Sequence, residues 1–166
     1  MAKDSRTGDA PSLWDRPGFL VRRLHQISVA IFMDEMGDLD ITPVQFGALS
    51  IVSANPGIDQ SALARELGID RANVADVVAR LSASGYIERR ASAKDRRAKS
   101  LLITAAGEQH LREANTRFSK VHRRLLEPLS REEREVFLDL LLRLIEGNNS
   151  LGRAVLRLEP RGEPAA

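Results

Sequence analysis

The sequence contains no cysteine. This absence excludes disulfide bonds, zinc sites with thiolate ligands and cysteine nucleophiles. No apolar run approaches the roughly 18 residues that a membrane span requires, and residues 1–12 are polar, so neither a transmembrane helix nor a secretory signal is expected. These absences predict a cytoplasmic protein with no membrane partner.

Patterns typical of enzymes and metal sites are also missing. The three histidines, His25, His110 and His122, are dispersed, and the last two are twelve residues apart rather than at the i, i+4 spacing that chelates a metal from one helix. The sequence has no strained serine elbow of the nucleophilic type and no glycine-rich phosphate loop. We therefore expect neither an enzyme nor a bound cofactor.

What the sequence does have is enough apolar residues for one domain, since 43% of its 166 residues are hydrophobic. Helical periodicity dominates, and strand patterns are confined to one short segment, so the predicted fold is mainly α with a small antiparallel hairpin. We expect a disordered N-terminus over residues 1–12, a single domain over 13–147, and a short extension with a disordered tail over 148–166.

Two short amphipathic helices meet at a tight turn between residues 60 and 81. The first ends at Gly68, a residue type that adopts the left-handed conformation at helix C-termini, and Asp70 is the predicted N-cap of the second. The predicted buried face of the second helix is Val74, Val77, Val78 and Leu81. This pattern is a helix-turn-helix, whose second helix enters the DNA major groove in many proteins, although such helix pairs also occur in ordinary helical cores.

A basic hairpin follows the helix pair. Residues 86–90 and 98–103 have the pattern of two strands joined by a loop. Between Tyr86 and Ser100 there are six cations and two anions, so the local net charge is six minus two, or +4, whereas the whole chain carries +2. A charged run is usually a solvated face, but this one lies beside a helix-turn-helix and therefore favours contact with a phosphate backbone.

Three segments together resemble the multiple-antibiotic-resistance regulator (MarR) family of winged-helix transcription factors. They are Ile41 to Leu49, the helix pair, and Asp95-Arg96-Arg97 followed by Leu102-Ile103-Thr104, where Ile103 replaces the leucine that is usual in the family. The resemblance covers about residues 17–147. It implies a winged helix-turn-helix DNA-binding region.

The resemblance also implies how the rest of the chain is used. It places the winged helix-turn-helix at about residues 42–104 and dimerisation helices at 17–38 and 105–147. It implies a homodimer, a pseudo-palindromic double-stranded DNA operator, and a small-molecule pocket between the dimerisation and DNA-binding regions. Because cysteine is absent, the thiol-based peroxide sensing found in part of this family is excluded here.

The expected DNA contacts come from the second helix of the pair and from the hairpin. Asn73 suits adenine through N6 and N7, while Arg71 and Arg80 suit phosphates. The resemblance implies that Asp95 orients Arg97 into the minor groove. The full set of predicted DNA contacts is Arg71, Ala72, Asn73, Asp76, Arg80, Arg89, Arg90, Lys94, Asp95, Arg96, Arg97 and Lys99.

A predicted helix over residues 17–36 carries a wide apolar stripe, with three basic residues near its start. If these side chains lie on the surface, they are simply solvated. If they face a cavity, they suit an anionic ligand, because guanidinium pairs with carboxylate. The resemblance implies aromatic acids, phenolic compounds or acyl-CoA thioesters as effectors. The predicted effector contacts are Trp14, which otherwise serves as a packing anchor, Arg22, Arg23, His25 and Phe46.

Capping boxes at Thr42 and Ser130 mark two further helix starts. The last helix carries a leucine-rich face that is either a dimer seam or intramolecular core.

Taken together, the sequence predicts a homodimeric, sequence-specific transcriptional regulator, a repressor released from its operator by a small anionic aromatic or acyl-CoA-type ligand. The alternatives are a winged-helix protein-interaction module and a non-specific architectural DNA binder.

Overall fold

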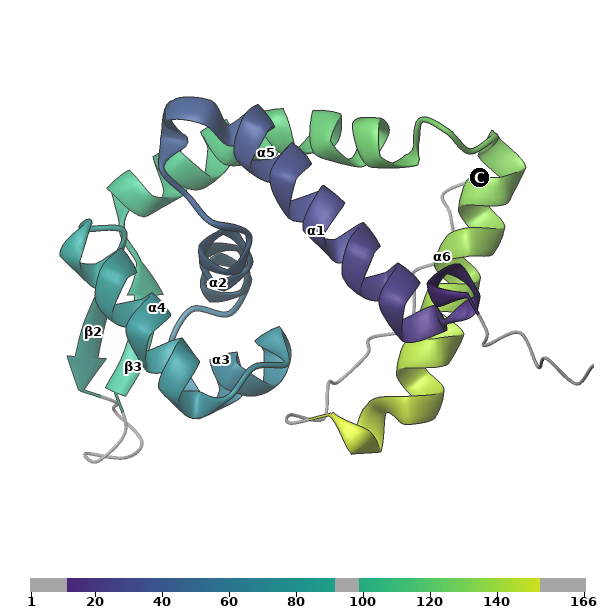
Figure 1. The fold of residues 1–166 in the computed structure, drawn as a ribbon. Coiled ribbons are helices and arrows are strands. Elements are labelled where there is room, and N and C mark those ends of the chain that lie inside the picture. The colour runs from purple at the N-terminus through teal and green to yellow at the C-terminus, as the bar shows by residue number, and fades with distance from the viewer. Residues whose placement is uncertain (1–11, 92–98, 153–166) are drawn as a thin grey trace, which may run out of the picture.

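The computed structural model describes residues 12–91 and 99–152. Over these residues the fold is mainly helical with one small antiparallel sheet, as the sequence predicts (Figure 1). The elements in order are η1 (Leu13–Asp15), α1 (Pro17–Met36), η2 (Gly37–Leu39), α2 (Pro43–Ala54), β1 (Ile58–Asp59), α3 (Gln60–Leu67), α4 (Arg71–Ala83), β2 (Ile87–Ala91), β3 (Lys99–Ile103), α5 (Ala105–Leu126), α6 (Arg131–Asn148) and η3 (Asn149–Leu151).

Both predicted capping boxes are present. At the start of α2, Thr42 Oγ1 accepts from Gln45 N at 3.3 Å while Gln45 Oε1 accepts from Thr42 N at 2.8 Å. Ser130 and Glu133 make the same reciprocal pair at the start of α6, with distances of 3.2 and 2.7 Å. Because each pair satisfies two amides that have no partner within the helix, these residues determine where the two helices begin.

The sheet has three strands rather than the two predicted. β2 pairs with β3 in the expected hairpin, from Ile87 opposite Ile103 to Ala91 opposite Lys99. The additional strand, β1, pairs antiparallel with β3 through Ile58 opposite Leu101, which gives the order β1-β3-β2. Two residues are too few for an alternating pattern, and α3 begins directly after them, so periodicity alone does not detect this strand.

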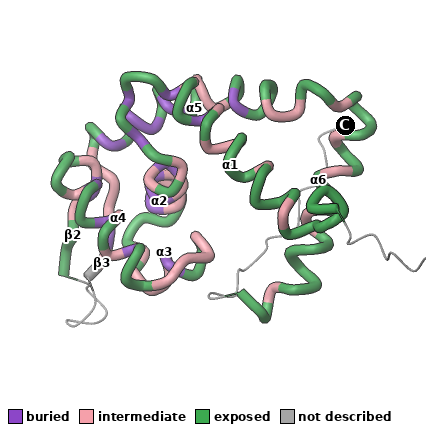
Figure 2. The backbone as a smooth tube through the Cα atoms, in the orientation of Figure 1, coloured by how far each residue is buried: buried purple, intermediate pink, exposed green. Residues whose placement is uncertain are grey.

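The hydrophobic core lies between the end of α1, α2, α3, α4, the sheet and α5, where Figure 2 shows most of the buried residues. Leu49 and Val52 of α2 are fully buried at its centre, as are Val74 and Val78 of α4. The predicted inner face of α4 is therefore confirmed, although Val77 is only half-buried. This core holds α4 against α2 and leaves the opposite side of α4 in solvent.

The end of α1 is tied to α5 by two arginines. Arg117 Nη1 donates to the Met36 carbonyl and to Asp38 Oδ1, both at 2.7 Å. The hydrogen bond from Arg117 holds the pKa of the Asp38 carboxyl below its ordinary value, and the charge of the guanidinium acts in the same direction. Arg124 Nη1 contacts the carboxylates of Asp34 at 2.5 Å and Glu35 at 2.6 Å. These contacts fix the direction in which the chain leaves α1 for α2.

Helix α6 lies apart from this core (Figures 1 and 2). It has no buried residue, and its side chains at Val136, Leu138, Leu140, Leu144 and Ile145 are between 37% and 60% exposed. Of the two interpretations of this leucine-rich face, intramolecular core is therefore wrong for the described part of one chain. In that part, no helix is long and apolar enough to cross a membrane.

Candidate nucleic-acid interface and effector cavity

The helix pair is joined by a three-residue turn whose geometry follows from two residue types. Gly68 adopts φ 66°, and its amide donates to the Arg65 carbonyl at 3.1 Å, which ends α3. Asp70 then caps α4, because its Oδ1 accepts from Asn73 N at 2.9 Å. Both predicted signals are thus present, and together they set the direction of α4 relative to α3.

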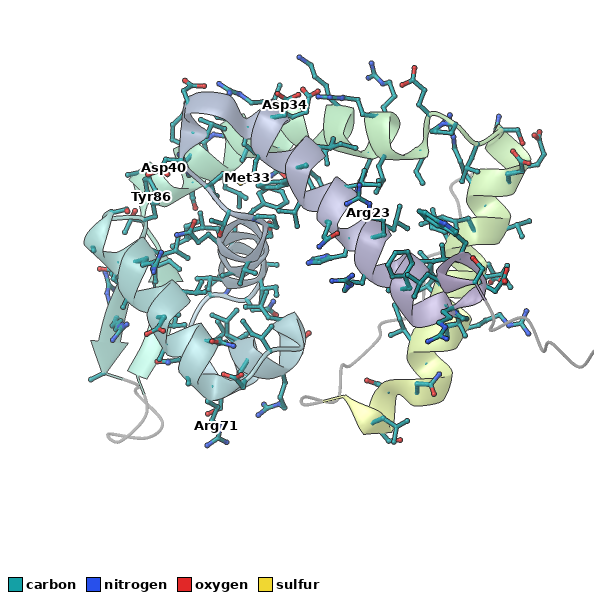
Figure 3. The ribbon with its side chains drawn as sticks, viewed as in Figure 1. Arg23, Met33, Asp34, Asp40, Arg71 and Tyr86 are labelled. Carbon is teal, nitrogen blue, oxygen red and sulfur yellow. The ribbon has the colours of Figure 1, made fainter. Side chains whose placement is uncertain are left out.

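The predicted DNA-contacting side chains of α4 lie together in solvent. Arg71, Ala72, Asn73, Asp76 and Arg80 are all exposed. Figure 3 shows Arg71 at the N-terminal tip of α4, pointing away from the rest of the molecule. A shallow groove of about 300 Å³ runs between this face and the start of α2. Its lining is Thr42, Val44, Gln45, Ile69, Asn73, Asp76, Val77 and Arg80.

The sheet continues this exposed surface. Arg89 and Arg90 of β2 are exposed, and Arg90 Nη2 pairs with Glu88 Oε1 at 2.6 Å. The other predicted contacts of the hairpin, Lys94, Asp95, Arg96 and Arg97, lie outside the described residues, as does the side chain of Lys99. A contact between these residues and DNA stays a prediction.

The base of the hairpin is held to α4 and α5 by backbone contacts around Tyr86. Tyr86 N donates to the Leu81 carbonyl at 2.9 Å, and Thr104 Oγ1 donates to the Gly85 carbonyl at 2.7 Å. The Tyr86 ring also stacks on His110, with ring centroids 4.3 Å apart. These contacts hold the hairpin and α4 in one orientation, so that both present their exposed residues as a unit.

A separate cavity of about 540 Å³ lies between α1, α2 and α5. Most of its lining is apolar or aromatic, and four side chains bring hydrogen-bonding groups: His25, Ser28, Ser50 and His122. The remaining lining residues are Val29, Phe32, Pro43, Phe46, Gly47, Ile51, Phe118, Val121 and Leu125. An apolar cleft with a few polar groups at this scale is typical of a small-molecule site.

Of the predicted effector contacts, the structure places His25 and Phe46 in this lining and the other three elsewhere. Trp14 is 65% exposed and packs edge-on against Phe19, with ring centroids 5.4 Å apart. Arg22 lies over the same Phe19 ring, 5.7 Å from its centroid, and Arg23 hydrogen-bonds Gln26 at 3.4 Å. Within one chain, Trp14 belongs to η1 and Arg22 and Arg23 to the first half of α1, and none of the three lines the cavity.

The sequence analysis missed His122 as a cavity residue, because it considered His122 only for metal chelation. His122 packs against Phe118, one helical turn earlier, with ring centroids 4.4 Å apart, and both side chains line the cavity. The i, i+4 spacing of these two rings on α5 is the signal that was available. In the described residues, no three His, Cys, Asp or Glu side chains lie close enough to hold a metal ion.

Comparison with known proteins identifies the family. Residues 39–98, which run from the end of η2 to the residue before β3, match the model of the MarR family. The chain is also 31% identical over 125 residues to the transcriptional regulator HosA of Escherichia coli, an alignment that covers 75% of this chain and 91% of HosA. The chain belongs to the MarR family.

Two solved structures place this MarR-family protein among regulators that bind DNA and ligands. The PcaV transcriptional regulator of Streptomyces coelicolor, solved with its natural ligand, is 31% identical, with a TM-score of 0.77 over 82% of this chain and 96% of PcaV. The transcriptional repressor CouR, bound to a 23-mer DNA duplex, is also 31% identical, with a TM-score of 0.75 over 80% of this chain and 94% of CouR. The MarR-family winged-helix fold and the class of transcriptional regulator are thereby established.

Proposed function

We propose that this MarR-family protein is a homodimeric, sequence-specific repressor that a small anionic ligand releases from its operator. The observation that carries the proposal is the exposed polar face of α4 beside the arginines of β2, in a fold shared with a repressor solved on DNA. Its relatives are regulators, and we propose no enzymatic role. Since genomic DNA is its partner, the expected location is the cytoplasm.

In this proposal, α4 enters the major groove and the hairpin reaches the adjacent backbone. Ala72, Asn73 and Asp76 face base edges, while Arg71 and Arg80 face phosphates. Asp76 argues against an architectural binder, because a carboxylate on the reading face weakens binding to any DNA that offers it no base donor. Residues 42–104 then form the DNA-binding unit.

A second copy of the chain is the proposed partner for the exposed face of α6. Helices over residues 17–38 and 105–147 form the dimerisation region, which, without ligand, supports the two copies of α4 (the reading helices) at the separation that fits DNA. Two-fold symmetry then implies two half-sites about one helical turn, roughly 10 base pairs, apart. A pseudo-palindromic operator follows from that symmetry.

The cavity between α1, α2 and α5 is the proposed effector site, and an aromatic carboxylate is the ligand class that it suits best. Phe46 and Phe118 supply aromatic faces, while His25 and His122 supply ring N–H donors for a carboxylate. Acyl-CoA thioesters are the other class implied by the family resemblance. The ligand acts by preferring the spacing of the reading helices that does not fit DNA.

A gel-shift titration tests the proposal. The purified protein is titrated against DNA from just upstream of its own gene, at about physiological salt and with excess competitor DNA. A discrete shift that survives competitor indicates a specific regulator. A smear that competitor abolishes indicates an architectural binder, and no shift with any DNA fragment tested favours a protein-interaction module.

The hairpin assignment makes a further prediction. Arg97→Ala should weaken operator binding by roughly tenfold or more, because an arginine in the minor groove meets an enhanced negative potential. The measurement is an operator titration at moderate salt, with the dimer checked by light scattering. Arg112→Ala removes an exposed α5 arginine away from the hairpin and should leave affinity unchanged. If Arg97→Ala binds the operator as tightly as the unmodified protein, Arg97 does not contact the minor groove.

A further inference from the structure

The N-cap of α4 makes two hydrogen bonds to one residue. Asp70 Oδ1 accepts from Asn73 N, and Asp70 Oδ2 accepts from Asn73 Nδ2, each at 2.9 Å. The first bond is the ordinary capping contact. The second bond holds a side chain that the proposed function places at the base edges.

The neighbouring helix shows that capping alone does not require this second contact. Asp59 caps α3 with a single oxygen, because its Oδ1 accepts from both Ser61 N and Ala62 N at 2.8 Å. In α4 both carboxylate oxygens of Asp70 act on Asn73. The contact with the side-chain amide is therefore an addition to the cap.

The chemistry of the pair fixes which way the Asn73 amide faces. A carboxylate only accepts hydrogen bonds, so the amide nitrogen must point toward Asp70 and the carbonyl oxygen away from it. Asp70 is half-buried while Asn73 is exposed. One N–H of Asn73 is donated to Asp70, and among the described residues the other N–H and the carbonyl oxygen have no partner, so they are available to one from solvent.

That remaining pair of groups matches one base best. In the major groove, an adjacent donor and acceptor fit adenine, whose N7 accepts and whose N6 amine donates. Guanine offers two acceptors, O6 and N7, at the same edge and leaves the outward oxygen of Asn73 without a donor. Because the amide is already oriented, little side-chain freedom is lost when the base is bound.

We infer that Asp70 is a positioning residue that orients Asn73 to read adenine, and that each operator half-site carries an adenine opposite the first turn of α4. This inference rests on the proposed function, because it assumes that α4 lies in the major groove. It adds a residue that touches no base, and it ties the base preference of one operator position to the hydrogen bond between Asp70 and Asn73.

Selection from a randomised double-stranded DNA library tests the inference and needs no known operator. The unmodified protein and four variants are each used to enrich bound sequences. Asn73→Ala removes the reading side chain. Asp70→Ser keeps an N-cap oxygen but removes the second acceptor, and Asp70→Asn keeps the cap and the side-chain volume but replaces that acceptor with a donor.

Asp59→Ser is the matched control. It makes the same substitution at the N-cap of α3 and removes the same charge, but the Asp59 carboxylate caps backbone amides of α3 and orients no side chain of α4 in the described residues. Its enriched operator should equal that of the unmodified protein. Thermal unfolding followed by circular dichroism shows whether each variant is folded, so that loss of structure is separated from loss of base preference.

The expected result is a symmetric pair of adenines whose preference over guanine falls roughly tenfold or more in Asn73→Ala. Asp70→Ser should weaken the same preference while other positions stay unchanged. In Asp70→Asn, the new amide donor turns the Asn73 oxygen inward and its nitrogen outward, so the preference at this position should shift toward guanine.

Two results overturn the inference in different ways. If an operator is enriched but folded Asp70→Ser and Asp70→Asn keep the full adenine preference, Asp70 does not position Asn73, and the proposed function still stands. If the unmodified protein enriches no sequence at all, the proposed function itself fails. An enriched operator without a symmetric adenine also rejects the assignment of Asn73 as an adenine reader.

Discussion

Gly107 sets how closely α5 approaches the base of the hairpin. A Cβ at this position would lie 2.2 Å from the Tyr86 carbonyl oxygen, which already accepts from Thr104 N and Thr104 Oγ1. Gly107→Ala should therefore lower the free energy of unfolding by roughly 1–3 kcal/mol, because the backbone of Tyr86 cannot move without straining these bonds. Urea denaturation at one protein concentration measures the change.

Gly147→Ala is the control for this prediction. Gly147 also lies in a helix, but an added Cβ there meets no atom within 4 Å among the described residues of the same chain. This variant should be as stable as the unmodified protein or gain up to about 1 kcal/mol, since alanine favours a helix over glycine. If both variants behave alike, the close approach at Gly107 does not limit stability.

Single residues also show what the sequence can predict about the site. Thr42, Asp70 and Ser130 cap helices as predicted, because a cap depends on residues three positions apart in the chain. The meeting of His25 and His122 in one cavity depends on how α1 and α5 pack, and no local pattern contains that information. Local chemistry was thus predictable, and contacts between distant segments were not.

At the scale of elements, α6 is a helix whose apolar side chains stay exposed within one chain. Leu144 is 60% exposed and lies on its leucine-rich face. Leu144→Arg should convert the proposed dimer to monomers, because a desolvated guanidinium without a partner is costly at an apolar interface. Sedimentation at micromolar concentration measures the mass, and circular dichroism reports whether the chain is folded.

Glu146→Arg is the matched variant on the same helix. Glu146 lies two positions after Leu144, so its side chain is rotated by about 200° around the helix axis, toward the opposite side. This variant should keep the mass of the unmodified protein. A folded Leu144→Arg protein with an unchanged dimer mass would exclude this face as the seam.

The elements themselves were predictable to the extent that their sequence patterns are long. The helix predicted over residues 17–36 is α1 with the same ends, and both hairpin strands were found within one residue of their ends. β1 was missed, since its pairing with β3 joins residues more than forty positions apart. A long periodic segment can therefore be predicted from its own sequence, whereas a two-residue strand can be recognised only from the strand with which it pairs.

At the scale of the whole molecule, α2 connects the proposed effector cavity to the DNA-reading face. Pro43, Phe46 and Gly47 line the cavity, while Thr42 and Gln45, from the same turn, line the groove beside Asn73 of α4. A ligand that displaces the start of α2 therefore also displaces its contacts with α4. This shared element gives the two sites a physical route for coupling, with each ligand biasing one arrangement of α2.

This coupling yields a prediction for His122. Benzoate should release the unmodified protein from its operator, and His122→Ala should need a roughly tenfold higher concentration, because it loses a hydrogen bond to a charged group. The measurement is an operator gel shift over a benzoate series. His122→Ala should bind operator normally without benzoate, since the side chain lies away from α4.

Asn115→Ala, exposed on α5 outside the cavity, should respond like the unmodified protein. A full response of His122→Ala at the original concentration would place the carboxylate elsewhere, whereas benzoate binding without release would break the proposed link through α2.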